Sequence, residues 1–274
     1  ALAEYFGAIE GASLEANKGA YSYAWMIIFA VIAAIMVLIG LYHIRMLPSN
    51  QIPSTTKKTT SKVGRELVAV IANLFTKKHI FYYICFIILY RLAEGFIMKI
   101  APLFLRASRE VGGLGLSLKE IGTLNGVFGS AAFVLGSLLA GIYVSKFGLK
   151  RTLFTLCCIF NLPFLAYTFL AVTQPTNVYL KGTCITMEYF GYGFGFVGLT
   201  LFMMQQIAPG KHQMSHYAFA SGIMNLGVML PGMVSGYFSD LLGYRNFFIY
   251  VLIATIPAFL ITYFIPFTYD DSKK

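Results

Sequence analysis

Long, continuously apolar stretches alternate with short polar stretches along the chain. Each apolar stretch is 19 to 26 residues long, and a helix that rises about 1.5 Å per residue needs about 20 residues to cross the hydrocarbon of a bilayer. Strands of a membrane barrel would instead show about ten residues of alternating polarity. The pattern therefore predicts an all-α membrane protein with seven transmembrane helices, at residues 24–42, 80–105, 121–144, 152–173, 182–204, 217–239 and 246–267.

The spans and the stretches between them divide the chain into five parts. We expect an outer segment, one transmembrane helix, a cytoplasmic linker, a six-helix bundle and a cytoplasmic tail, at residues 1–23, 24–43, 44–79, 80–267 and 268–274. The chain starts at Ala1 rather than at a methionine, and it lacks the basic start and short apolar run of a signal peptide. We therefore expect a piece of a longer protein.

The linker ends in a short amphipathic segment. Leu67, Ile71, Leu74 and Phe75 follow one another at helical spacing and form an apolar face. Such a face suits a helix that lies on the inner membrane surface before the second span. An ordinary lead-in turn to that span is the alternative, and both interpretations stay open.

Composition supports the membrane class. Apolar residues make up 58% of the chain and charged residues 12%, whereas a globular protein carries about 25% charge. Disordered, collagen-like and disulfide-stapled proteins need other compositions and are excluded. The four cysteines fall inside apolar stretches and show no zinc or redox spacing, so we expect buried thiols and no metal site at Cys85, Cys157, Cys158 and Cys184.

The net charge of +10 is explained by topology. If the N-terminus lies outside, thirteen Lys and Arg residues lie in inner segments and six in outer segments. Basic residues concentrate on the cytoplasmic side, so this is the expected orientation, with the C-terminus in the cytoplasm. No basic patch with interleaved aromatic residues remains, and nucleic-acid binding is not expected.

The last six spans contain an internal repeat. The pattern formed by Gly141, Ser145, Gly148 and Lys150 recurs 95 residues later at Gly236, Asp240, Gly243 and Arg245. This offset corresponds to three spans, and three is odd, so the two copies lie on opposite faces of the membrane. The sequence thus predicts two inverted three-helix repeats, a plan found in secondary transporters.

The first copy of this pattern resembles a known loop. The segment Gly141-Ile-Tyr-Val-Ser145-Lys146-Phe-Gly148-Leu-Lys150-Arg151 is similar to the Gly-x3-Asp-Arg-x-Gly-Arg-Arg loop of the major facilitator superfamily, with Ser145 in place of the usual Asp. The resemblance implies that the glycines allow close helix approach and that the loop takes part in gating. It also implies the six-helix half-bundle of that superfamily.

Further segments narrow the resemblance to muropeptide permeases of the AmpG type. These segments are Leu89–Glu94, Gly115–Gly122, Glu188–Gly193 and His216–Ser221. The likeness covers residues 80–267 and implies that the chain holds the sixth helix, the central loop and helices seven to twelve, with the N-terminal half of the same protein as partner. It implies that the spans lie in the inner membrane of a bacterium and that the function is proton-coupled import of muropeptides or similar sugar-peptides.

Four charged residues lie inside the predicted spans: Arg91, Glu94, Lys99 and Glu188. An unpaired charge at the bilayer centre costs at least about 3 kcal/mol, so we expect all four to face inward as one polar cluster on a substrate and proton pathway. Helical spacing puts the first three on one side of their helix. An ion cluster that only ties helices together is the alternative for Arg91 and Glu94.

Other functions remain as alternatives. A transporter for another anionic solute, such as a siderophore or sugar derivative, has the same features. A seven-helix receptor shares the number of spans and the orientation, although its usual sequence motifs are missing. No nucleophile and base pair or metal-ligand spacing is visible, so we expect no enzyme and no cofactor.

Overall fold

The protein is helical throughout the part that the structure describes. The computed structural model describes residues 2–7, 9, 15–46 and 60–269, and no β-strand occurs among them. This confirms the all-α prediction. The chain divides into two compact units, Ala1–Thr59 and Thr60–Lys274, which are described separately. Residues 47–59 of the predicted linker and residues 270–274 of the predicted tail lie outside the described residues.

The first unit consists mainly of one long helix. The short helix α1 (Leu2–Tyr5) precedes α2 (Lys18–Met46), which contains the first predicted span. Ala24 is the one buried residue of α2 among those described, and its large apolar side chains are exposed on every side. A helix that is apolar all round needs lipid or other helices for burial, as a membrane span does.

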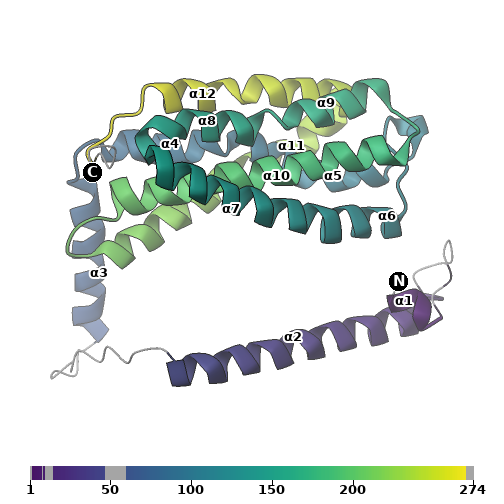
Figure 1. The fold of residues 1–274 in the computed structure, drawn as a ribbon, viewed down its shortest axis with the longest axis horizontal. Coiled ribbons are helices and arrows are strands. Elements are labelled where there is room, and N and C mark those ends of the chain that lie inside the picture. The colour runs from purple at the N-terminus through teal and green to yellow at the C-terminus, as the bar shows by residue number, and fades with distance from the viewer. Residues whose placement is uncertain (1, 8, 10–14, 47–59, 270–274) are drawn as a thin grey trace. The chain divides into compact units, whose positions relative to one another are not determined.

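The second unit is a bundle whose helices lie side by side, with α3 across one end (Figure 1). Its helices are α3 (Thr60–Phe75), α4 (Ile80–Tyr90), α5 (Leu92–Arg106), η1 (Arg109–Val111), α6 (Leu118–Thr123), η2 (Leu124–Gly129), α7 (Ser130–Phe147), α8 (Leu149–Asn161), α9 (Phe164–Thr173), α10 (Val178–Phe202), η3 (Met203–Ile207), α11 (Gln213–Ala254) and α12 (Ile256–Tyr263). Each predicted span of residues 80–267 falls largely on one or two of them.

Five stretches of the described residues are long and apolar enough to cross a membrane. They are Lys18–Met46, Ile80–Arg106, Leu118–Phe147, Leu149–Thr173 and Gln213–Tyr263. The last holds the sixth and seventh predicted spans, with non-helical backbone between them at Gly243. Helix α10 is not among the five. It carries the charged residues Lys181 and Glu188 in its first half and four glycines in its second half. The structure thus supports a multi-pass membrane protein, and the count of seven spans stays a prediction.

The glycines of α10 allow neighbouring helices to approach closely. A Cβ atom added at Gly193 would lie 2.2 Å from the carbonyl oxygen of Phe133 on α7, and one added at Gly195 would lie 2.2 Å from the Cβ of Phe160 on α8. Such small residues let membrane helices pack backbone to backbone. These glycines therefore serve helix packing, and they place α10 in the middle of the bundle.

Two apolar clusters fill the bundle, and they meet along the chain at Arg91. The first includes Phe86, Tyr90 and Phe202, and the second includes Phe104 and Phe248. Helix α4 contributes to the first cluster up to Tyr90, and α5 contributes to the second from Ala93 onward. Arg91 therefore lies at the boundary between the two apolar clusters.

Candidate functional site

A helix break places the first charged pair. Helix α4 ends at Tyr90 and α5 begins at Leu92, so Arg91 lies between them with φ −104° and ψ 7°. Its guanidinium donates two hydrogen bonds to Glu94, from Nε to Oε2 at 2.6 Å and from Nη2 to Oε1 at 2.5 Å. Both residues are buried, at 4% and 5% exposure. This bidentate geometry gives one of the stronger interactions between an arginine and a carboxylate.

Aromatic residues of α10 cover this pair. The ring of Phe196 lies below the guanidinium carbon of Arg91, with 5.5 Å to the ring centroid, which is within the range of a cation–π contact. The hydroxyl of Tyr192 accepts a long hydrogen bond of 3.5 Å from Arg91 Nη2. The pair therefore lies where α4 and α5 face α10, and not on the outside of the bundle.

A small cavity of about 110 Å³ brings the two carboxyl groups together. Glu94 and Glu188 both line it. The other lining residues are mostly apolar or aromatic, and they are Ile97, Met98, Ala101, Pro102, Leu105, Asn125, Tyr167, Tyr189 and Tyr192. Pockets for drug-sized ligands measure about 300 to 1,000 Å³. The cavity therefore fits a few water molecules, and a sugar-peptide needs a larger space.

Two polar groups at this cavity have no partner among the described residues. Glu188 forms no hydrogen bond and no ion pair there, and the Oδ1 atom of Asn125 is buried without a hydrogen-bond donor. Buried polar atoms without partners are costly and need a stated reason. Water in the cavity would supply the missing hydrogen bonds, because polar cavities of this size hold ordered water.

Lys99 does not join the cluster, which corrects the prediction of four charges at one place. It is exposed, and its Cγ lies beside Gly232 of α11, where an added Cβ would be 3.4 Å away. Five residues along α5 separate Glu94 from Lys99, which is about 140° around a helix. No lysine or arginine is among the described residues that line the cavity, and the cation beside it is Arg91, which pairs with Glu94.

Lys181 is a buried cation that the sequence placed in an outer segment. In the structure it belongs to the first turn of α10, is 4% exposed and donates from Nζ to the carbonyl oxygen of Leu114 at 3.0 Å. It therefore ties the loop before α6 to α10. Lys181 lies on the same helix as Glu188, two turns before it, and the two form no ion pair. Lys181 stands one position before the predicted span, so its burial is not expected from the apolar pattern.

Sequence reasoning also missed the uncharged polar members of the site. Asn125, Tyr167, Tyr189 and Tyr192 line the cavity together with the carboxyl groups. Each lies within a predicted span, and such residues could have been singled out as polar groups that need partners in a membrane. Their spacing alone does not tell a cavity wall from an ordinary helix contact.

The residues predicted to form a gating loop lie mostly in helices. Gly141, Ser145 and Lys146 belong to the end of α7, Lys150 and Arg151 to the start of α8, and Gly148 stands between the two helices. Of the second copy, Gly236 and Asp240 lie in α11, Gly243 interrupts it, and Arg245 follows. The side chains of Lys146, Lys150 and Arg151 are exposed. Gly148 is therefore the one residue between α7 and α8.

The two copies of the repeat share an unusual backbone conformation. Gly148 has φ 78° and ψ 149°, and Gly243 has φ 69° and ψ 161°. This region is open in practice to glycine alone. Gly141 and Gly236 also match, since an added Cβ would meet no atom within 4 Å at either position. These agreements support the repeat at the two turns where the motif recurs.

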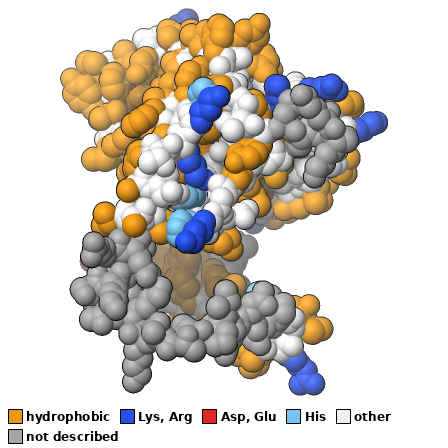
Figure 2. Space-filling view, turned by 90° about the vertical axis from the view of Figure 1, so that its left-hand side faces the viewer, with side chains coloured by type: hydrophobic (Ala, Val, Ile, Leu, Met, Phe, Trp, Pro, Cys, Tyr) orange, Lys and Arg blue, Asp and Glu red, His pale blue; other side chains and the backbone are white. Residues whose placement is uncertain are grey.

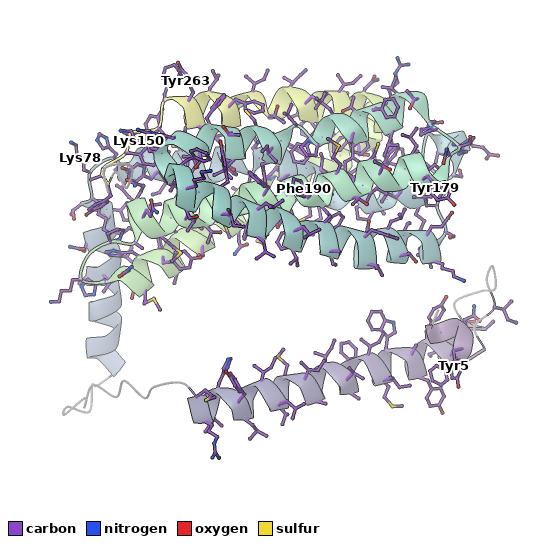
Figure 3. All side chains as sticks on the ribbon, viewed as in Figure 1. Tyr5, Lys78, Lys150, Tyr179, Phe190 and Tyr263 are labelled. Carbon is purple, nitrogen blue, oxygen red and sulfur yellow. The ribbon has the colours of Figure 1, made fainter. Side chains whose placement is uncertain are left out.

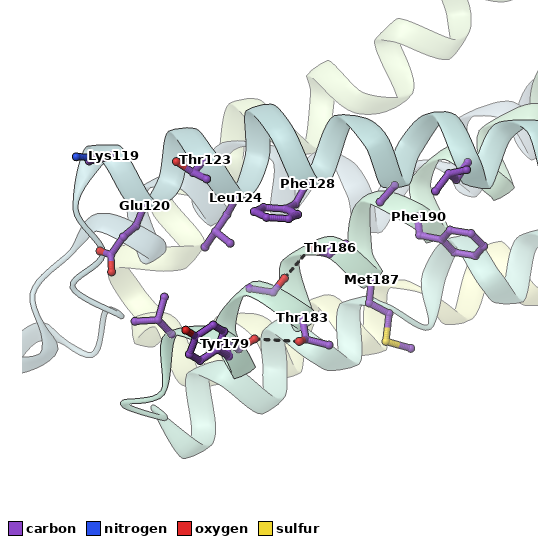
Figure 4. Close-up of a pocket in the computed structure, with 14 residues that line it drawn as sticks. Lys119, Glu120, Thr123, Leu124, Phe128, Tyr179, Thr183, Thr186, Met187 and Phe190 are labelled. Carbon is purple, nitrogen blue, oxygen red and sulfur yellow. Dashed lines mark hydrogen bonds between the residues drawn. The ribbon is translucent and has the colours of Figure 1, made fainter. Parts of the chain in front are cut away.

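A second, larger groove has a volume of about 860 Å³ (Figure 4). Figure 4 shows Leu124 and Phe128 on one side of it, facing Thr186 and Phe190 of α10 on the other. The hydroxyl groups of Thr183 and Thr186 donate to carbonyl oxygens of their own helix, at 2.9 and 2.8 Å. The groove wall is therefore mostly apolar, with Lys119 and Glu120 at one end.

No metal site is apparent. Across residues 15–46 and 60–269, and in the short described piece before them, no group of three or more His, Cys, Asp or Glu side chains has an arrangement that could hold a metal ion. The polar side chains of the site are those of one Arg, two Glu, one Asn and several Tyr.

Comparison with known proteins shows similarity to permeases. No protein-family model matches the chain. An anhydromuropeptide permease of Escherichia coli is 22% identical over 209 residues, which are 76% of this chain and 41% of the relative. A protein of Rickettsia bellii named as transporter AmpG 1 is 26% identical over 242 residues, 85% of this chain and 56% of the relative. A protein of Rickettsia prowazekii named as transporter AmpG 2 is 27% identical over 191 residues, which are 69% of this chain and 44% of the relative.

These relatives confirm the resemblance to permeases of the AmpG type that the motifs predicted. The chain spans about two fifths to somewhat more than half of the length of these relatives. Their names describe permeases and transporters, and none of these names describes an enzyme. They do not favour the receptor that the sequence left open.

Proposed function

We propose that this chain is the C-terminal part of a secondary transporter that imports muropeptides or similar sugar-peptides across the bacterial inner membrane together with protons. The permease relatives support the substrate class. The proton assignment is supported by one observation above all, the small cavity lined by two carboxyl groups, of which one, Glu94, is paired with the guanidinium of Arg91.

Charge balance at the cavity carries the argument for protons. If both carboxyl groups are ionised, Arg91 neutralises one of them and leaves one negative charge without a partner among the described residues. An uncompensated charge in a membrane interior is expensive. One proton restores neutrality, and Glu188 is the group to receive it because Glu94 already holds Arg91. The cavity has room for the water through which a proton arrives.

Coupling then follows from competition for Arg91. A solute that carries carboxylates can draw the guanidinium away from Glu94, and Glu94 then becomes the group that needs a proton. Proton binding and solute binding would thus favour each other, as symport requires. The small cavity does not hold the solute, so we place the solute in a larger space formed with the rest of the protein.

The topology belongs to the same proposal. We propose seven spans with the N-terminus outside and the C-terminus in the cytoplasm, and two inverted three-helix repeats in residues 80–267. The matching backbone at Gly148 and Gly243 supports this arrangement. We also propose that the exposed cations Lys146, Lys150 and Arg151 contact the N-terminal half of the full protein at a cytoplasmic gate.

The test is uptake of labelled anhydro-muropeptide by membrane vesicles that contain the full-length protein, with and without a pH gradient. Wild type should accumulate the solute only with the gradient. Glu188→Gln should abolish accumulation but keep exchange of solute across the membrane without a gradient. Glu110→Gln changes an exposed carboxyl outside the cavity and is the matched control, with normal uptake expected.

Two results would contradict the proposal in different ways. Unchanged gradient-driven uptake in Glu94→Gln and Glu188→Gln would remove both carboxyl groups from proton coupling. Absence of muropeptide uptake by wild type, in vesicles that accumulate another anionic solute, would remove the substrate class and leave the transport assignment in place.

A further inference from the structure

Helix α3 lies across one end of the bundle, whereas the other long helices of this unit run along the bundle (Figure 1). It precedes α4 directly, and α4 begins the stretch Ile80–Arg106 that can cross a membrane. A helix that lies across the direction of the spans, at their end, lies along the surface of a membrane rather than through it.

One side of α3 is fixed to the bundle. Leu74 is 1% exposed, the ring of Phe75 meets that of Phe219 edge to face at 6.0 Å, and His216 Nε2 lies 3.2 Å from the carbonyl oxygen of Val70. Just beyond the helix, Lys77 Nζ donates to the carbonyl oxygens of Ile207 and Pro209, the second at 2.7 Å. The orientation of α3 about its own axis is therefore set by the protein.

The outer side of α3 presents an apolar ridge of Val68, Ile71 and Phe75, which follow at helical spacing. Phe75 stands at the edge of the ridge, where its ring contacts Phe219 of the bundle and also Phe81, with 6.0 Å between ring centroids in each case. Val68 and Phe81 are 68% and 70% exposed, and Ile71 and Phe75 are 38% and 40% exposed. Phe81 belongs to α4, so the ridge continues into a helix of the membrane-crossing bundle. Apolar surface of this kind is unfavourable in water by about 25 cal/mol for each Å².

Basic residues surround this end of the bundle. Figure 2 looks at this end and shows Lys, Arg and His side chains, with no acidic side chain visible among the described residues. Lys78 lies three residues after the end of α3 and is exposed, and Figure 3 shows it at the same end as Lys150. Each Lys or Arg near an anionic membrane surface contributes about 1 kcal/mol to binding. The charge therefore complements acidic phospholipid headgroups.

We infer that α3 is an interfacial helix that binds the surface of a membrane containing anionic phospholipids. The ridge of Val68, Ile71, Phe75 and Phe81 enters the region between headgroups and acyl chains, and Lys78 pairs with lipid phosphates. The continuity of the ridge with α4 and the basic charge at its end identify lipid as the occupant. This inference does not depend on the transported solute.

The test uses tryptophan fluorescence of the full chain in vesicles. Trp25 is the single tryptophan of the sequence, so Trp25→Phe provides a background for Ile71→Trp, Phe75→Trp and the control Asn73→Trp, whose position is exposed on the opposite side of α3. Each variant is reconstituted in equal parts of phosphatidylcholine and phosphatidylglycerol, with acyl chains brominated close to the headgroup. Bromine quenches only tryptophan in direct contact with lipid.

Quenching at positions 71 and 75 should exceed that at position 73 severalfold, and it should fall in phosphatidylcholine alone. Adding Lys78→Gln should reduce the difference between the two lipid mixtures. Equal quenching at all three positions would overturn the inference. So would blue-shifted emission at 71 and 75 without quenching, because a protein segment or a second copy would then cover the ridge. Equal quenching in both lipid mixtures would overturn the role of anionic headgroups.

Discussion

The hydroxyl of Tyr90 donates a hydrogen bond to the carbonyl oxygen of Gly195 at 2.9 Å and joins α4 to α10 one residue before Arg91. The ring of Tyr90 also packs on Phe160, with 5.1 Å between centroids. Phe160 in turn lies against Gly195, where no Cβ fits. Three helices are thus held together beside the break, and this contact sets the distance between the two sides of the candidate site.

The first prediction concerns this close contact. Gly195→Ala should lower the melting temperature in detergent by several degrees, because its Cβ would lie 2.2 Å from the Cβ of Phe160 and the helices would have to move apart. Gly222→Ala is the control, since an added Cβ there meets no atom within 4 Å. It should raise stability by up to about 1 kcal/mol, as alanine does in a helix interior. Equal effects of the two changes would contradict the packing at Gly195.

The second prediction concerns the buried ion pair. Glu94→Gln should destabilise the protein by about 3 to 5 kcal/mol, because it leaves the guanidinium of Arg91 buried without its counter-charge. Adding Arg91→Met should restore much of that stability, since a buried pair can often be replaced by uncharged groups at little cost. Thermal unfolding of the two single variants and the double variant measures the coupling. Additive effects would show that the pair is not a unit.

Transport should separate from stability in these variants. The double variant of Arg91 and Glu94 should be well folded and inactive in gradient-driven uptake. If it folds and transports as wild type does, the pair only ties helices together, which is the structural alternative for these two residues.

The third prediction uses the repeat. Gly148→Ala and Gly243→Ala should each destabilise by about 1 to 3 kcal/mol, because both need a backbone region that side chains rarely adopt. Gly141→Ala and Gly236→Ala, at the other glycines of the same motif, should be neutral or slightly stabilising because the added methyl group meets open space. The four melting temperatures together test whether the two copies are equivalent. If alanine leaves the melting temperature unchanged at one of Gly148 and Gly243 but not at the other, the two copies of the motif are not equivalent.

The fourth prediction concerns the exposed cations of the first copy. A triple change of Lys146, Lys150 and Arg151 to alanine should reduce uptake by the full-length protein and leave its membrane insertion and melting temperature unchanged. The side chains are exposed, so the folded unit loses little packing when they are shortened. Uptake equal to that of wild type would exclude a gating role for these charges.

Apolar stretches of the sequence were enough to place the helices. Their length and continuity predict helices rather than strands, and each predicted span between residues 24 and 267 falls on helical structure. The reason is local, because a chain in lipid must satisfy its backbone hydrogen bonds within each segment. The spacing of Arg91 and Glu94 likewise predicts their pairing, because three residues separate neighbours on a helix surface.

Only the tertiary structure decided which charges meet. Glu94 and Glu188 are far apart in sequence and share a cavity because glycines of α10 admit close helix contacts. Lys99, near Glu94 in sequence, is exposed beside Gly232 of α11 and does not line the cavity. Lys181 is buried because the loop at Leu114 supplies a carbonyl oxygen. Sequence periodicity fixes the direction of a side chain around its own helix, and the packing of the other helices determines what it meets there.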